Sequence, residues 1–382
     1  MIATTLFWCS LFLLIYTFAG YPLFLRFVNL VSRRKSPVAP AVTSSDFPSV
    51  SFLIVARNES ARIAARLQNL AECRYPGERE IILVCDACDD DTAERAQGCG
   101  LTIPLTVVPL AERSGKSKAL NIAASQAKGA IFVFADARQR FEPGAVEAMA
   151  ALLVQHREAA AVSGSLEIEP STEGAAAGMD AYWRLEKWIR NEESRWDSVI
   201  GCTGAIYAMR REDFHPIPQD TLIDDVVVPM QALVRGRRIL FEPAAVAYDP
   251  QTLDTHHEKR RKVRTLAGNY QMLFRYPQWL LPWVNRAWWQ LLSHKYLRLG
   301  GPLYLAACLA GALILAPSSL FFQVTLGAQV LAYLVGFAGM TPWLRRFRIL
   351  SIPAGFLFLQ LQSAKAFLHY LQLRLRPASG SW

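Results

Sequence analysis

Two adjacent carboxylates, Asp224 and Asp225, stand inside an apolar run that extends from Leu222 to Pro229. Each negative charge raises the pKa of its neighbour, and the apolar flanks raise both pKa values further by excluding water. One of the two aspartates is therefore a candidate to accept a proton near neutral pH, as a general base does. The same pair also fits the start of a helix, where aspartates bind the free backbone amides of the first turn. The pair alone does not separate these two interpretations.

The elements that would position this pair follow a regular alternation. Short apolar runs at residues 50–55, 81–85 and 130–135 are typical of buried strands, and the segments 61–72 and 118–127 have helical spacing. This alternation predicts an α/β fold with a mainly parallel sheet.

A polar side chain follows each predicted strand. Asn58 and Glu59 come after the first run, Asp86 after the second and Asp136 after the third. Because ligands bind at the carboxyl ends of parallel strands, we expect these four side chains to lie in one crevice.

Cations are also available for this crevice. Gly115, Lys116 and Lys118 stand at the predicted start of a helix, where backbone amides and lysines favour phosphate, although a solvated basic turn has the same composition. A dense basic run at residues 259–264 follows later and includes Arg261 and Arg264.

The composition indicates a membrane protein. Of the 382 residues, 52% are hydrophobic and the mean hydropathy is +0.17, which is too apolar for an ordinary soluble enzyme. The net charge of +9 is compatible with nucleic acid, acidic lipids or anionic small substrates. The basic clusters lie beside apolar segments and not along a helix with interleaved base-stacking aromatics, which favours membrane lipids and phosphate over nucleic acid.

Long apolar segments at residues 6–31, 299–316 and 320–340 are candidates to span a bilayer. The segment 349–370 contains glutamine, lysine and histidine, so it either spans the bilayer or packs as a helix beside the others. The basic residues 33–35 follow the first apolar segment, which places the next domain in the cytoplasm by the positive-inside rule. We therefore expect an integral membrane protein, in a bacterial inner membrane, with a cytoplasmic catalytic domain.

These observations divide the chain into successive parts. They are a transmembrane helix with its basic flank (1–35), a linker (36–48), the catalytic domain (49–250), a basic motif with amphipathic interfacial helices (251–298), two or three transmembrane helices (299–372) and a tail (373–382). Within them, residues 162–249 look rich in loops, and the tryptophans of residues 272–294 indicate an interfacial helix.

The order and spacing of these motifs resemble the membrane-bound family-2 glycosyltransferases, which include bacterial polysaccharide synthases of the cellulose, hyaluronan and poly-N-acetylglucosamine type. The resemblance covers most of the chain. It implies a GT-A fold and inverting transfer of a sugar from a UDP-sugar to a carbohydrate or lipid-linked acceptor at the cytoplasmic face of the membrane. Other subunits of a polysaccharide or glycolipid assembly system are possible partners.

The resemblance also assigns residues that would hold the donor. Residues 55–59 match the family motif P-A-Y-N-E, so Asn58 and Glu59 would hold the uridine, and Asp86 matches an aspartate that contacts uracil. Residues 115–121 match G-K-x-x-A-L-N, which implies that Lys118 lies near the phosphates.

Two further motifs concern the reacting groups. Residues 223–225 match T-E-D, whose last aspartate is the general base, so Asp225 inherits that role and Asp224 would orient or tune it. Residues 261–265 match Q-x-x-R-W, with Arg264 retained over the pyrophosphate and with Arg261 and Thr265 in place of glutamine and tryptophan. Without that tryptophan, which resembles an acceptor-stacking element of processive synthases, single-sugar transfer to a lipid is an alternative to long-chain synthesis.

The family's D-x-D motif, which meets the diphosphate and a divalent metal, falls on Asp136 to Arg138, so an arginine replaces the second carboxylate. Either Asp136 holds Mg²⁺ or Mn²⁺ together with the diphosphate, or Arg138 supplies part of the positive charge itself. We expect the ion to be retained, since phosphates and waters can complete its coordination. The same replacement motivates another alternative, a nucleotide-sugar-binding membrane module without catalysis.

Overall fold

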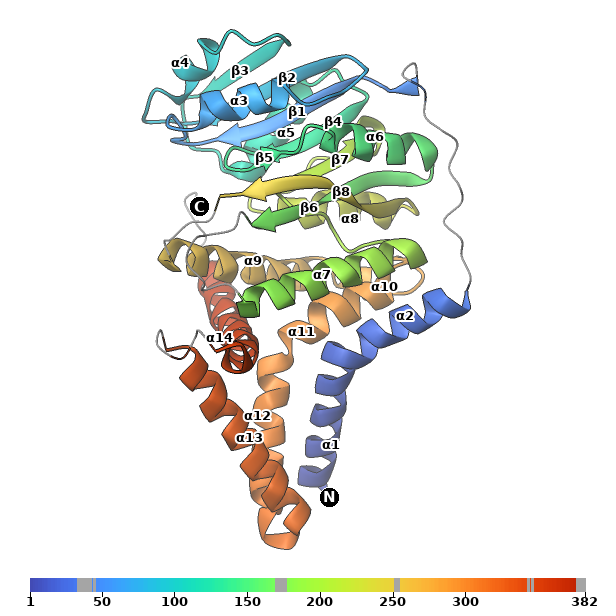
Figure 1. Ribbon diagram of the computed structural model, residues 1–382, viewed down its shortest axis with the longest axis vertical. Helices are drawn as coiled ribbons and strands as arrows, with labels where there is room; N and C mark the ends of the chain where they lie inside the picture. Colours follow the sequence, from blue (N-terminus) through green and yellow to red (C-terminus); the bar gives the residue numbers. More distant parts are fainter. Residues whose placement is uncertain are drawn as a thin grey trace.

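The computed structural model describes residues 1–32, 43, 46–168, 177–250, 255–341, 344 and 347–375. A sheet domain lies at one end of the molecule and a stalk of helices at the other (Figure 1). Helices α7 (Ala177–Trp196) and α9 (Thr255–Arg275) cross between them, beneath the sheet. Most of the predicted linker, the basic residues 33–35 and the end of the tail lie outside the described residues.

One mixed sheet forms the sheet domain, in the order β3-β2-β1-β4-β7-β6-β8-β5. Its strands are β1 (Val50–Ala56), β2 (Arg79–Asp86), β3 (Leu105–Leu110), β4 (Ile131–Asp136), β5 (Arg140–Phe141), β6 (Ala159–Ile168), β7 (Ile206–Arg210) and β8 (Arg238–Asp249). The pairs β1–β2, β1–β4, β2–β3 and β6–β8 are parallel, whereas β4–β7, β6–β7 and β5–β8 are antiparallel. The predicted strands correspond to β1, β2 and β4, so the α/β fold with a mainly parallel sheet is confirmed.

Apolar residues cover both faces of this sheet, as continuous apolar strands require. The core on one face includes side chains of α3 (Ile63–Ala71), α4 (Thr92–Gln97) and α6 (Ala145–Gln155). The core on the other face includes side chains of α5 (Lys116–Gln126) and α8 (Asp224–Leu233), and it continues into the interfacial region with Met272 and Trp279. Helices α3 and α5 are the two helices that the sequence predicts.

The prediction that residues 162–249 are rich in loops is wrong. This stretch contains most of β6, all of α7, β7 and α8, and β8. The reason lies in its small residues, since β6 begins Ala-Ala-Ala-Val-Ser-Gly-Ser and lacks the β-branched pattern of an obvious strand. Close packing demands these small residues, because a Cβ at Gly164 would collide with the backbone oxygen of Ala245 in β8.

The prediction of a single interfacial helix over residues 272–294 is also wrong. Helix α9 ends at Arg275, and a 3₁₀ turn (Pro277–Leu280), the short α10 (Trp288–Gln290) and a π-helical turn (Leu291–Tyr296) follow. Pro277 and Pro282 interrupt this segment because proline disfavours the helical conformation of the residue before it. Trp279 is buried in the core, whereas Trp283 is exposed.

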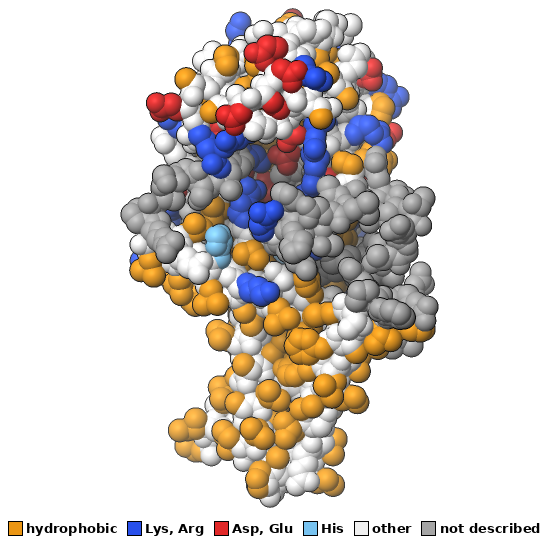
Figure 2. Space-filling model, turned by 90° about the vertical axis from the view of Figure 1, so that its left-hand side faces the viewer, with side chains coloured by type: hydrophobic (Ala, Val, Ile, Leu, Met, Phe, Trp, Pro, Cys, Tyr) orange, Lys and Arg blue, Asp and Glu red, His pale blue; other side chains and the backbone are white. Residues whose placement is uncertain are grey.

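Three helices in the described part of the chain are long and apolar enough to cross a membrane: Ile2–Val31, Gly301–Ser318 and Leu320–Gly339. They contain α1 (Ile2–Ile15), α2 (Tyr21–Val31), α12 (Gly301–Leu315) and α13 (Leu320–Gly339), and the short α11 (Leu297–Leu299) precedes α12. They agree with the three predicted segments, and apolar side chains cover the stalk that they build (Figure 2). Helix α14 (Arg348–Leu375) does not meet the same criterion and packs against α9 and α13.

The first of these helices is not straight. A π-helical turn at Tyr16–Gly20 separates α1 from α2, and α2 turns aside to lie under the sheet domain (Figure 1). The Tyr16 hydroxyl accepts a hydrogen bond from Trp289 Nε1 at 2.8 Å and lies 2.8 Å from Ser293 Oγ. This turn therefore fastens the N-terminal helix to the segment that precedes α12.

A buried polar cluster joins the stalk to α7. His294 Nδ1 lies 2.8 Å from Glu193 Oε1, and its Nε2 lies 2.9 Å from Glu186 Oε1. Tyr21 of α2 donates to Glu193 at 2.5 Å, and Arg298 lies 2.8 Å from Glu186 Oε2. Burial opposes the ionisation of Glu186, but His294 and Arg298 outweigh it and hold the pKa of this carboxyl well below its usual value. Three separate segments thus depend on one imidazole.

We expect His294→Leu to lower the free energy of unfolding by about 3–5 kcal/mol, because it removes the buried imidazole that Glu186 and Glu193 share and leaves an apolar side chain against both carboxylates. Chemical denaturation in detergent micelles measures this change. The control is His156→Leu, which breaks a pair with the exposed Glu158 and should cost less than about 1 kcal/mol. Equal losses in the two variants would contradict the structural importance of the cluster.

Candidate active site

The aspartate pair lies in the first turn of α8, as the helix-start interpretation predicts. Asp225 Oδ2 accepts a hydrogen bond from the Gly204 backbone N–H at 3.0 Å. The Asp225 backbone oxygen accepts another from the Cys202 N–H at 2.8 Å. That oxygen is free to do so because the residue four positions later is Pro229, which has no N–H to donate within the helix. The loop 201–204 therefore closes over the start of α8.

This close approach explains a glycine of the loop. Gly201 has φ of +72°, and a Cβ there would lie 2.9 Å from the Cα of Val226. A side chain at this position would push the loop away from Asp225. The Gly201–Ala205 segment thus packs its backbone against the candidate base.

The environment of Asp225 suits a general base. Burial and the neighbouring charge of Asp224 raise the pKa of Asp225 to about 6, although Lys116 and Lys295 oppose this rise. Such a carboxylate is mostly ionised at neutral pH and still binds a proton far better than an ordinary aspartate does. The aspartate pair therefore begins a helix and also provides a candidate base, so the two interpretations are compatible.

Lys116 connects the strand ends to this helix. Its Nζ lies 3.0 Å from Asp136 Oδ1 at the end of β4 and 3.2 Å from Asp224 Oδ2. Burial lowers the pKa of Lys116, but Asp136, Asp224 and Asp225 outweigh it and raise that pKa above its usual value. Lys116 therefore remains a cation at the centre of the crevice.

Sequence reasoning chose the other lysine of this motif. Lys118 is exposed on the wall of the cavity, whereas Lys116, two residues earlier, points at the acidic groups. Residues two apart face different sides of a helix, so the G-K pattern itself contained the information needed to separate them.

Asp86 organises the loop that carries Lys116. It is fully buried, and its carboxylate accepts hydrogen bonds from the backbone N–H of Ser114 at 2.6 Å and of Gly115 at 3.0 Å. The sequence placed this residue at the crevice but did not predict these bonds. Its contact with uracil stays a prediction.

Asn58 and Glu59 lie at the end of β1, beside the loop that follows β2. Asn58 Oδ1 accepts a hydrogen bond from the Asp89 N–H at 2.8 Å. Glu59 Oε2 lies 3.0 Å from Arg62 Nε, and burial raises the pKa of Glu59. The strand ends thus converge on the edge of the sheet where the nucleotide is expected.

Arg138 has a structural partner. Its guanidinium pairs with Asp249, the last residue of β8, and Arg261 Nη1 lies 3.6 Å from the same carboxylate. Arg264 lies on α9, at the wall of the cavity described next. Two of the predicted phosphate-binding arginines are therefore held at the end of β8.

The donor set for a metal ion is small. Among the described residues, no group of three or more His, Cys, Asp or Glu side chains could hold an ion. Asp136 is partly exposed and can offer a carboxylate oxygen, so these residues fit an ion that takes its other ligands from a diphosphate and water.

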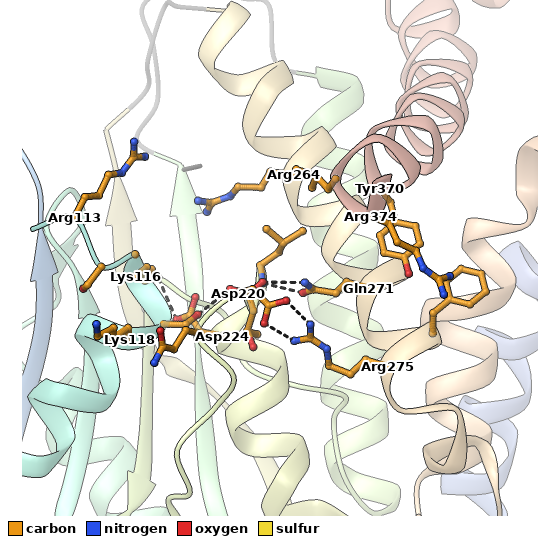
Figure 3. Close-up of a pocket in the computed structure, with 18 residues that line it drawn as sticks. Arg113, Lys116, Lys118, Asp220, Asp224, Arg264, Gln271, Arg275, Tyr370 and Arg374 are labelled. Atoms are coloured by element: carbon orange, nitrogen blue, oxygen red, sulfur yellow. Dashed lines mark hydrogen bonds and ion pairs between the residues drawn. The ribbon is translucent and has the colours of Figure 1, made fainter. Parts of the chain in front are cut away.

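A cavity of about 780 Å³ opens between the sheet domain, α9 and α14 (Figure 3). Lys116, Asp224 and Arg264 belong to its lining, so it reaches the charged centre of the crevice. Figure 2 shows basic side chains gathered at this level, between the sheet domain and the apolar stalk. The volume and the charge suit a phosphate-bearing ligand.

The sequence comparison places this site in a class. A family model described as "Glycosyltransferase like family 2" matches residues 48–271, which include β1, the aspartate pair and most of α9. The chain therefore belongs to glycosyltransferase family 2 and is a glycosyltransferase.

Individual relatives are more distant. The poly-beta-1,6-N-acetyl-D-glucosamine synthase of Staphylococcus aureus (strain COL) is 26% identical over 243 residues, which are 62% of this chain and 58% of that protein. The probable glycosyltransferase YdaM of Bacillus subtilis (strain 168) is 24% identical over 245 residues, or 60% of this chain and 57% of that protein. The chain thus spans less than two thirds of the length of these relatives.

A solved structure covers the whole architecture. The mannosyltransferase PcManGT from Pyrobaculum calidifontis, in complex with GDP-Man and Mn²⁺, is similar with a TM-score of 0.70 and 20% identity, over 95% of this chain and 99% of that chain. This likeness confirms the predicted GT-A fold together with its helical part.

We expect Asp225→Asn to be more stable than the wild type at pH 8, by about 1–3 kcal/mol, and no more stable at pH 4. Asp225 binds a proton more tightly in the folded protein than in the unfolded chain, because folding raises the pKa of its carboxyl from 3.8 to about 6. The native aspartate therefore loses stability as pH rises through that range, and asparagine does not. Denaturation of the two proteins at both pH values measures the difference.

The matched control is Asp91→Asn, an exposed aspartate paired with Arg95, which should show no gain at pH 8. A pH-independent difference between Asp225→Asn and the wild type would contradict the raised pKa.

Proposed function

We propose that this protein is an inverting glycosyltransferase that moves a sugar from a UDP-sugar to a carbohydrate or lipid-linked acceptor. The observation that carries the proposal is that a candidate base and a buried cation lie together at the start of α8. A carboxylate with a raised pKa, Asp225, stands on the first turn of α8, and the cation Lys116 is held by the residue before it.

The reaction needs one proton transfer and one displacement. In our proposal, Asp225 removes the proton from an acceptor hydroxyl, and the oxygen of that hydroxyl attacks the anomeric carbon of the donor. The bond from this carbon to the diphosphate breaks, and the bonding electrons leave with the nucleoside diphosphate. A positioned base contributes about 10²–10⁴ to such a rate.

Positive charge stabilises the departing diphosphate. Lys116 pairs with Asp224, the neighbour of the proposed base, and Lys118 and Arg264 line the same cavity. Preorganised cations of this kind stabilise charge that develops in the transition state without reorganisation of water. A Mg²⁺ or Mn²⁺ ion held by Asp136 and the diphosphate would supply further positive charge to the leaving group.

The apolar stalk supports a membrane location for this chemistry. Three helices of the described chain are long and apolar enough to span a bilayer, and the positive-inside rule favours a cytoplasmic sheet domain. Nucleotide sugars dissolve in the cytoplasm, so the proposed orientation brings donor and membrane-borne acceptor together.

We expect Asp225→Asn to lower the rate of sugar transfer by about 10²–10⁴ while UDP binding is unchanged. Transfer is measured in nanodiscs across UDP-glucose, UDP-N-acetylglucosamine, UDP-galactose and GDP-mannose. Glu158→Gln, at an exposed glutamate in the turn between α6 and β6, is the control. Wild-type activity in Asp225→Asn would sink the base assignment.

The same panel tests a second candidate function, a nucleotide-sugar-binding module without catalysis, which the replacement of a family carboxylate by Arg138 favours. UDP binding without transfer or hydrolysis of any donor, with and without a divalent ion, would establish that function instead.

We expect Mn²⁺ to bind only when UDP is present, because the protein alone offers few oxygen ligands. Paramagnetic resonance of free Mn²⁺ measures this binding with and without UDP. Asp136→Asn should abolish it, and Glu158→Gln should not. If UDP fails to promote Mn²⁺ binding in the wild type, the metal proposal is wrong.

A further inference from the structure

The cavity extends well beyond the groups that the proposed reaction uses. One wall belongs to the sheet domain and carries Arg113, Lys116 and Lys118, whereas Tyr370 and Arg374 lie on the α14 side (Figure 3). The Tyr370 ring stacks on Phe274 of α9, with centroids 5.4 Å apart and planes 5° from parallel. The far end of the cavity is therefore built from two helices of the membrane-proximal region.

Positive charge exceeds negative charge along this lining. Its cationic side chains are Arg113, Lys116, Lys118, Arg264, Arg275 and Arg374, and its acidic side chains are Asp220 and Asp224. Both acids are engaged, since Asp220 Oδ1 accepts from Arg275 Nη1 at 3.0 Å and Asp224 pairs with Lys116. The diphosphate of a single nucleotide sugar, with one charge on each phosphate, would neutralise only part of the remaining charge.

Arg374 is the cation farthest along the chain from the donor motifs. It is exposed, and neither it nor Lys118 or Arg113 makes a hydrogen bond or ion pair with any residue that the structure describes. A cation on the wall of a cavity, with no protein partner in the described chain, is available to an anionic ligand.

An apolar path leads from the stalk to this point. Phe367, Leu371 and Leu375 recur at four-residue spacing on α14, so they share one face, and all three are exposed. Tyr370, Leu373 and Arg374 of the same helix line the cavity beside that face. Helix α14 also packs against α13, a candidate membrane span.

We propose that the α14 end of this cavity binds the phosphate headgroup of a membrane-borne, long-chain lipid that carries the acceptor. Arg374 contacts the phosphate, and the apolar face of α14 contacts the chain. The inference rests on the proposed transfer function and commits that function to a lipid-linked acceptor.

Two features favour this occupant over a free polysaccharide. A neutral glycan gains nothing from unpaired cations, whereas a lipid phosphate satisfies both the charge and the exposed apolar face. Asp224 also lines the cavity and Asp225 follows it in the same helical turn, so the acceptor group of a lipid bound at the α14 end can extend through this cavity toward the candidate base.

The test uses the full-length protein in nanodiscs of phosphatidylcholine, with farnesyl monophosphate as the probe and native mass spectrometry as the readout. We expect farnesyl monophosphate to bind and neutral farnesol to bind at least about tenfold more weakly. Arg374→Gln should weaken probe binding about tenfold, which corresponds to about 1.4 kcal/mol. Arg374→Lys should retain most of the affinity.

Arg157→Gln is the matched control, because this arginine is exposed in the turn between α6 and β6. It should leave probe binding unchanged. UDP affinity should be the same in Arg374→Gln and the wild type, which separates this end of the cavity from the donor end.

Several outcomes would overturn the proposal. They are equal binding of farnesol, displacement of the probe by inorganic phosphate at equal concentration, displacement by UDP, or no effect of Arg374→Gln. Transfer to a soluble oligosaccharide without probe binding would reject the lipid site and keep the transferase. Probe binding without any transfer would support the lipid site and reject the proposed reaction.

Discussion

The Lys116 ammonium lies between two carboxylates that come from different parts of the chain, Asp136 at the end of β4 and Asp224 at the start of α8. Each of these charges would be costly in a half-buried crevice without the others. Their mutual attraction therefore fixes the position of α5 and α8 relative to the sheet edge. The raised pKa of Asp225 depends on the same arrangement, because Asp224 raises it and Lys116 limits the rise.

Around this ion-pair centre, some aspartates hold the structure together and another is available for chemistry. Asp86 is buried and holds the loop before α5, and Asp249 holds Arg138. Asp225 Oδ2 accepts from the Gly204 N–H, whereas its Oδ1 makes no hydrogen bond to the residues that the structure describes. Aspartates are useful in all these places because a short carboxylate accepts several hydrogen bonds without crowding the backbone. These aspartates differ in the hydrogen-bond donors and cations that their neighbours provide.

Much of this was predictable from the sequence, and the failures have physical causes. Strands β1, β2 and β4 are apolar runs with polar ends, so their pattern alone predicted this part of the sheet. Strand β6 was missed because alanine, serine and glycine fill it, and only the packing of β8 explains that choice. The pairing of Arg138 with Asp249 joins residues 111 positions apart, so no local pattern contains it.

The proline-interrupted segment after α9 was misjudged for another reason. Its tryptophans indicated an interface, and the interpretation as one helix ignored Pro277 and Pro282. The motif directed attention to Lys118, whose place near the phosphates stays a prediction, whereas the ion pairs of Lys116 with Asp136 and Asp224 join separate parts of the chain and have no local signal.

The π-helical turn at Tyr16–Gly20 has a consequence for bilayer thickness. The part of the first helix that precedes α2 ends at Gly20, and the other two candidate spans have 18 and 20 residues. At 1.5 Å per residue, helices of this length measure about 27–30 Å, close to the hydrocarbon thickness of a bilayer. In a bilayer of that thickness, helix α2 would lie beyond the hydrocarbon core. A thinner bilayer would tilt the three short helices, and because α2 and α7 are bonded together, the whole catalytic edge would tilt with them.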